Sequence, residues 1–134
     1  MSIGSWDPSA GSPIDAPSLT SELLQDLALY SRDKKLESLT EAMPEADKQR
    51  LANLMQIDHE HWRAAAEPLD NEAIVHLIRF LAVAETLPGW EAGAKSPVIP
   101  LAKILRGRGA RLDKPQLLWL REVSENRYLP YGPL

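Results

Sequence analysis

The sequence predicts an all-α protein, an irregular bundle of about five helices. Apolar residues recur at spacings of three and four along most of the chain, as they do on one face of a helix. No segment alternates apolar and polar residues as a half-buried strand does. Proline and glycine interrupt the helical pattern at several points, so we expect separate helices joined by short loops.

The 134 residues predict one domain preceded by an arm. Residues 1–17 hold three prolines among serine, glycine and aspartate, with only Ile3, Trp6 and Ile14 to bury. Such a composition is typical of a flexible segment. We therefore expect a flexible N-terminal arm over residues 1–17 and a single helical domain over residues 18–134.

The first helix is expected to begin at Ser18. Four apolar side chains share one face at spacings of three and four: Leu19, Leu23, Leu27 and Tyr30. A similar spacing continues to Met43, so this helix either runs to about Ala42 or breaks near residues 31–33.

The next two helices are delimited by proline and aspartate. Pro44 suits the first turn of a second helix, which Pro68 ends. The apolar face of this helix is formed by Leu51, Leu54, Met55 and Trp62. Asp70 is a natural N-cap for a third helix over residues 71–86, because its carboxylate can accept from the free N–H groups there. The third helix is apolar nearly all round, which predicts a central position in the bundle.

Two further helices complete the bundle. Proline disfavours helical angles in the residue before it, so the fourth helix is expected to run from about Pro100 to Arg106. Gly107 or Gly109 would cap its C-terminus. The fifth helix opens with a capping box at residues 113–116 and is expected to stop around residue 126.

The chain ends in a tail, residues 126–134, that carries Tyr128 and Tyr131 among prolines. Proline stiffens such a tail in an extended form, and exposed tyrosine and leucine would reduce solubility. We therefore expect an extended aromatic tail docked on its own bundle. The alternative is that Tyr128 and Tyr131 bind a partner.

Composition argues against several classes of protein. Without cysteine the chain has no disulfide and no thiolate metal site. The N-terminus lacks the basic and apolar regions of a secretory signal. The most apolar stretch, which His76 and Arg79 interrupt, is too short to span a bilayer. We expect a soluble cytoplasmic protein that does not bind a membrane.

Residues 89–97, GWEAGAKSP, resemble a phosphate-binding loop, with Ala94, Lys95 and Ser96 where that motif has Gly-Lys-Ser. Such a loop follows a strand, whereas a helix is expected here, and alanine replaces the glycine beside the lysine. The segment is therefore interpreted as a loop between two helices. A weaker site for phosphate or a nucleotide at Lys95 and Ser96 remains as an alternative.

We find no combination of residues typical of an enzyme. Residues 58–62, DHEHW, bring metal-ligand types together, but His59 and His61 lie two apart and would point to different sides of a helix. The helical zinc motif needs histidines four apart. No set of serine, histidine and aspartate can be assembled, so we expect no enzyme activity, no metal and no cofactor.

Charge is divided unevenly along the chain. The net charge is −4, but residues 1–94 hold 7 Lys+Arg against 16 Asp+Glu, and residues 95–134 hold 8 against 3. Within residues 103–114, KILRGRGARLDK, five side chains concentrate the positive charge: Lys103, Arg106, Arg108, Arg111 and Lys114. They predict an adaptor or regulator that binds an acidic protein surface, or alternatively a protein that grips the phosphates of a nucleic acid. The negative net charge and the few neighbouring aromatic residues favour the protein partner. An ordinary solvated rim is the third interpretation.

Overall fold

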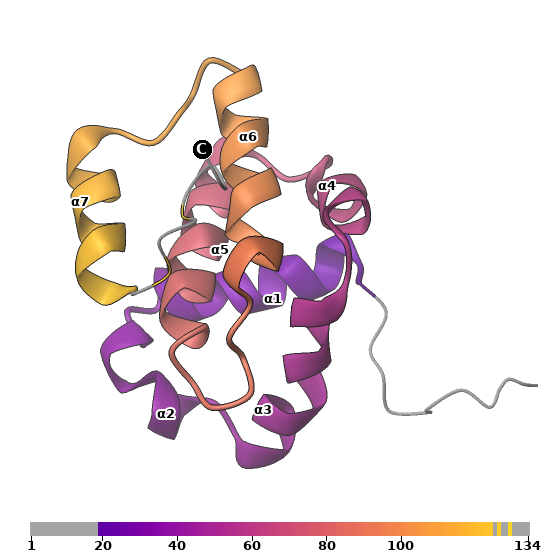
Figure 1. Cartoon of the computed structure of the whole chain (residues 1–134), viewed down its shortest axis with the longest axis vertical. Helices are drawn as coiled ribbons and strands as arrows, with labels where there is room; N and C mark the ends of the chain where they lie inside the picture. Colours follow the sequence, from indigo (N-terminus) through magenta and orange to yellow (C-terminus); the bar gives the residue numbers. More distant parts are fainter. Residues whose placement is uncertain (1–18, 125, 127–128, 130–134) are drawn as a thin grey trace, which may run out of the picture.

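A computed structural model describes residues 19–124, 126 and 129 (Figure 1). This part of the chain contains helices and loops without a strand, which confirms the all-α prediction. Its seven α-helices are α1 (Ser21–Arg32), α2 (Leu39–Ala42), α3 (Glu45–Leu51), α4 (His59–Ala66), α5 (Asn71–Ala84), α6 (Val98–Gly107) and α7 (Lys114–Val123). Three short 3-10 helices occur in the connections: Leu36–Ser38, Ala52–Gln56 and Gly93–Lys95. The prediction of about five helices was too low because two predicted helices are broken.

The first predicted helix breaks near residues 31–33, which was one of its two expected courses. α1 begins after Thr20, whose hydroxyl accepts from the Leu23 N–H at 3.1 Å, and it ends at Arg32. Lys34 then adopts a φ of 59°, a left-handed conformation that a helix cannot continue through. The remaining residues of the predicted helix form a 3-10 turn and α2.

The second predicted helix is interrupted where its sequence pattern is continuous. Its apolar face is buried as expected, but residues 52–56 tighten into a 3-10 helix. Asp58 is extended, with φ −71° and ψ 161°, and α4 begins after it. The buried Trp62 donates from Nε1 to the Leu54 carbonyl at 3.2 Å, which satisfies a backbone acceptor beside the break. The stretch therefore forms two helices, α3 and α4, instead of one.

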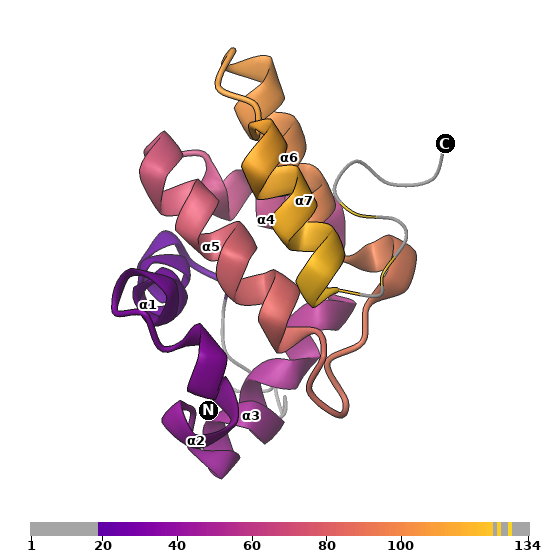
Figure 2. The same cartoon turned by 90° about the vertical axis from the view of Figure 1, so that its left-hand side faces the viewer.

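α5 is the central helix, as its apolar composition predicts. The Asp70 carboxylate caps it by accepting from the Ala73 N–H at 2.8 Å. Figure 2 shows α5 between α1 and α6, and α7 lies against a further part of its surface. The Tyr30 ring of α1 stacks on Phe80 with 5.4 Å between centroids, and Trp90 meets Phe80 edge-on at 6.2 Å. These rings join α1, α5 and the loop after α5.

α6 begins at Val98, two residues before the expected start, with Pro100 in its first turn. Proline is tolerated there because the first amides of a helix have no intrahelical acceptor. Gly109 ends the helix with a φ of 75°. The Ala110 N–H then donates to the Leu105 carbonyl at 2.8 Å, so the chain leaves α6 in a hydrogen-bonded turn.

The predicted capping box opens α7. The Gln116 N–H donates to the Asp113 carboxylate, and the Asp113 N–H donates to the Gln116 side-chain oxygen, both at 2.9 Å. α7 ends at Val123, earlier than expected. The expected arm over residues 1–17 lies outside the described residues, and so do Tyr128 and Tyr131 of the tail. Leu129, which is described, packs against the core.

None of the helices in the described part of the chain is long and apolar enough to cross a membrane.

Candidate functional site

Positive charge is concentrated at the C-terminal end of α6 and in the loop that leads to α7. We call this surface the basic end, and it consists of Lys103, Arg106, Arg108 and Arg111. All four residues are exposed, and residues 103–112 include no carboxylate. Figure 1 shows this end of α6 and its loop projecting at the top of the bundle, far from α2 and α3.

Arg108 differs from the other three because its guanidinium is bonded within the chain. It donates to the Leu69 carbonyl at 2.9 Å, to the Glu67 carbonyl at 3.0 Å and to Asn71 Oδ1 at 3.0 Å. These bonds join the end of α6 to the turn between α4 and α5. Arg108 therefore positions the basic end, and fewer of its N–H groups are left for a partner.

Lys103 and Arg111 are the cations best placed to meet a partner. Neither forms an ion pair or a side-chain hydrogen bond with another described residue. Arg106 is also exposed, on the last turn of α6. The turn at Gly109 and the bonds of Arg108 hold the backbone between these side chains in one conformation. The basic end is therefore a cationic surface whose backbone is held in one conformation.

The segment that resembles a phosphate loop connects α5 to α6, as expected. Trp90 is fully buried and donates from Nε1 to the Lys48 carbonyl at 2.9 Å, which anchors the loop to α3. Lys95 donates from Nζ to the Gln56 carbonyl at 3.0 Å. An anion at Lys95 would have to replace this bond, so the anion site stays a prediction that a thermal shift with phosphate would test.

A buried carboxyl group, that of Glu85, lies beside the same loop. Glu85 is 6 % exposed. The Ser96 hydroxyl donates to one carboxyl oxygen, and Asn126 Nδ2 donates to the other at 3.3 Å and to the Gly93 carbonyl at 2.9 Å. Burial raises the pKa of Glu85 from 4.5 to about 7, and the two hydrogen bonds offset only part of this rise. Ser96 therefore faces a group that becomes negative near neutral pH, which disfavours an anion there.

Sequence reasoning missed Glu85, although a signal was present. Glu85 follows Ile74, Ile78 and Leu81 along α5 at spacings of four, three and four. All three apolar residues are buried, so this spacing places the carboxyl on the buried face of the helix. An acidic residue at such a position indicates a buried titratable group.

The DHEHW segment forms the start of α4. His61 Nδ1 donates to the Asp58 carboxylate at 2.8 Å, and this bond is the main reason why the pKa of Asp58 lies below its usual value. His59 Nε2 is buried and has no hydrogen-bond partner within the described part. The described residues contain no group of three or more side chains that could hold a metal ion.

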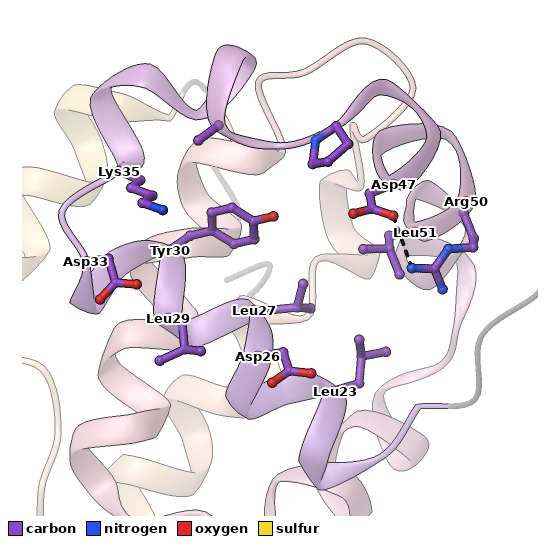
Figure 3. A pocket seen from close by; sticks show the side chains of 12 residues that line it. Leu23, Asp26, Leu27, Leu29, Tyr30, Asp33, Lys35, Asp47, Arg50 and Leu51 are labelled. Carbon is purple, nitrogen blue, oxygen red and sulfur yellow. Dashed lines mark hydrogen bonds and ion pairs between the residues drawn. The ribbon is translucent and has the colours of Figure 1, made fainter.

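A hollow of about 470 Å³ lies between α1 and the segment that forms α2 and α3 (Figure 3). Its apolar lining includes Leu27, Tyr30 and Leu51, and three carboxylates surround it: Asp26, Asp33 and Asp47. Asp47 is paired with Arg50 at 3.2 Å. Burial, with a smaller contribution from Asp47, raises the pKa of Tyr30. Two cations, Lys35 and Arg50, also line the hollow, so charges of both signs surround its apolar floor.

Comparison of the chain with protein-family models, with curated proteins and with solved structures gave no significant match. The function is therefore argued from the residues of this chain.

Proposed function

We propose that the chain is a protein-interaction module, an adaptor or regulator, whose basic end binds an acidic surface of another protein. The observation that carries this proposal is the exposure of Lys103, Arg106 and Arg111 together on a backbone that Arg108 and Gly109 hold in place. A surface that is ordered before binding loses less conformational entropy when the partner arrives. Complementary charge also accelerates the encounter and selects the partner.

A protein partner fits the basic end better than a nucleic acid does. Arg108 bonds within the chain, so Lys103 and Arg111 are the cations of the basic end that are best able to bind a partner's anions. The chain as a whole carries a net charge of −4, which repels a polyanion beyond the local contact. Residues 103–112 include no aromatic side chain that could stack on a base.

A pull-down with matched variants tests the proposal. The tagged full chain is incubated with nuclease-treated lysate of its source organism, beside the variant Lys103→Glu/Arg111→Glu. The control is Lys34→Glu/Arg63→Glu, which changes the net charge equally at two exposed residues outside the basic end. We expect a protein that wild type and control retain and that the basic-end variant loses.

The result that contradicts the proposal is a set of captured proteins that does not differ between the two variants. Fluorescence anisotropy with labelled duplex and single-stranded oligonucleotides separates the nucleic-acid alternative. Binding that weakens steeply with salt, and that is lost in Lys103→Glu/Arg111→Glu, would assign the basic end to nucleic acid instead.

A further inference from the structure

The described residues include two large apolar side chains that are well exposed. Leu29 of α1 is 46 % exposed and Leu118 of α7 is 54 % exposed. Single exposed leucines are common on proteins and need no partner. These two differ in their charged neighbours: acidic residues share the exposed side of α1 with Leu29, and basic residues share the exposed side of α7 with Leu118.

Leu29 lies on an acidic face of α1. Glu22, Asp26, Leu29 and Asp33 follow one another at spacings of four, three and four, so they share one side of the helix. All four are exposed, and neither Asp26 nor Asp33 forms an ion pair with another described residue. Asp33 lies at the C-terminus of α1, where the helix dipole disfavours a carboxylate. Asp33 therefore does not stabilise α1.

Two hollows flank this face. Leu29 and Asp26 line both the hollow of about 470 Å³ in Figure 3 and a second one of about 420 Å³ on the side of α5. A large side chain that approached Leu29 would therefore find space on either side. We call residues 22, 26, 29 and 33 the acidic face.

Leu118 lies on a basic face of α7. Lys114, Leu118 and Arg121 follow at spacings of four and three, and all three are exposed. α7 carries one carboxylate, Glu122, which is exposed and follows Leu118 at a spacing of four, so it also lies on this side of the helix, beside Arg121. Its opposite side packs on the bundle, where Leu120 is buried. We call residues 114, 118 and 121 the basic face; it does not include any residue of the basic end.

The geometry points to a second copy of this chain as the occupant of the acidic face: we propose that the basic face of α7 docks on α1 of another copy. The two faces match in charge and in spacing. Asp26 and Asp33 are seven residues apart, and so are Lys114 and Arg121, which is about 10 Å along either helix. Two ion pairs can therefore form at once, with Leu118 and Leu29 packed between them.

Each copy carries both faces on helices that lie on different sides of α5 (Figure 2). If the contact forms twice between the same two copies, it gives an isologous dimer with a two-fold axis. If it forms once between each pair of copies, it is heterologous and builds a ring or an open chain of copies. Because it uses other residues than the basic end, it can fail without affecting the proposed function.

Sedimentation velocity of the full chain over a range of concentrations tests this inference. We expect self-association that weakens as salt is raised, because the ion pairs are exposed. The variants Asp26→Lys/Asp33→Lys and Lys114→Glu/Arg121→Glu should each weaken self-association about tenfold or more, since each gives both faces the same charge. An equimolar mixture of the two variants should associate again, because each face then meets its opposite.

The control is Glu37→Lys/Glu41→Lys, which changes the charge equally at exposed residues outside the acidic face and should associate as wild type does. Leu118→Ala should weaken association without changing its salt dependence. Circular dichroism confirms that each variant is folded. A wild type that stays monomeric at every concentration overturns the inference, and so does a variant mixture that does not associate.

Discussion

Glu85→Gln should remove the loss of stability that ionisation of Glu85 causes as pH rises to neutrality. Glutamine has the shape of glutamic acid. Its amide oxygen can accept from Asn126, and its amide nitrogen can donate to the Ser96 oxygen in place of the bond that the Ser96 hydroxyl donates to Glu85. It cannot become charged. The variant therefore separates the cost of burying a negative charge from the loss of the two hydrogen bonds.

The size of the effect follows from the pKa of Glu85, which rises from 4.5 to about 7 in the folded chain. At about 1.4 kcal/mol per pKa unit, keeping this carboxylate ionised in the folded state costs about 3 kcal/mol. The folded chain binds more protons than the unfolded chain between these two pKa values. The contribution of Glu85 to the free energy of unfolding should therefore fall as pH rises from 4.5 to 7 and level off above 7. His76, whose pKa burial lowers from 6.5, contributes in the opposite direction.

Urea unfolding followed by circular dichroism at pH 5, 6, 7 and 8 measures this. We compare the free energy of unfolding of Glu85→Gln with that of wild type at each pH. The difference in favour of the variant should be about 2 kcal/mol larger at pH 8 than at pH 5. Glu91→Gln removes the same charge from an exposed position in the adjoining loop and serves as the control, with the same pH profile as wild type. Parallel profiles for wild type and Glu85→Gln would refute the reasoning.

Three substitutions test how the structure is held together, each by urea unfolding at neutral pH. Arg108→Ala removes three hydrogen bonds between α6 and the α4–α5 turn and should lower the free energy of unfolding by about 1–2 kcal/mol. The control Lys103→Ala, at an exposed residue, should change it by less than about 0.5 kcal/mol. Equal effects of the two substitutions would contradict the positioning role of Arg108. Asp113→Ala removes the N-cap of α7 and should cost about 1 kcal/mol, and an unchanged stability would show that the capping box contributes little. Trp90→Phe keeps most of the ring contact with Phe80 but loses the bond to the Lys48 carbonyl, so we expect a loss of about 1–2 kcal/mol, and a neutral result would mean that this bond does not anchor the loop.

Local signals predicted the structure best. Asp70 and the pair Asp113 and Gln116 cap α5 and α7 as expected, because a cap depends on residues within one turn of it. The break between α3 and α4 was missed because it involves a contact with another part of the chain. Lys95, 39 residues away, donates to the Gln56 carbonyl within this break, and apolar periodicity carries no signal of this.

The candidate site was predicted in the same uneven way. The sequence identifies the cations of the basic end by their proximity along the chain. It does not distinguish Arg108 from Arg111, since the acceptors of Arg108 lie 37–41 residues away. The spacing of residues in the sequence predicts which side chains share one side of α1 or α7. Only the structure shows which side of each helix is exposed.

The central claim is that the basic end binds an acidic protein surface, and an NMR titration tests it most directly. Isotope-labelled chain is titrated with the purified protein that the pull-down captures, and backbone amide shifts are followed. We predict that the shifts concentrate at residues 103–112 and that they disappear in Lys103→Glu/Arg111→Glu. Shifts centred on α1, or binding that this variant leaves intact, would contradict the claim.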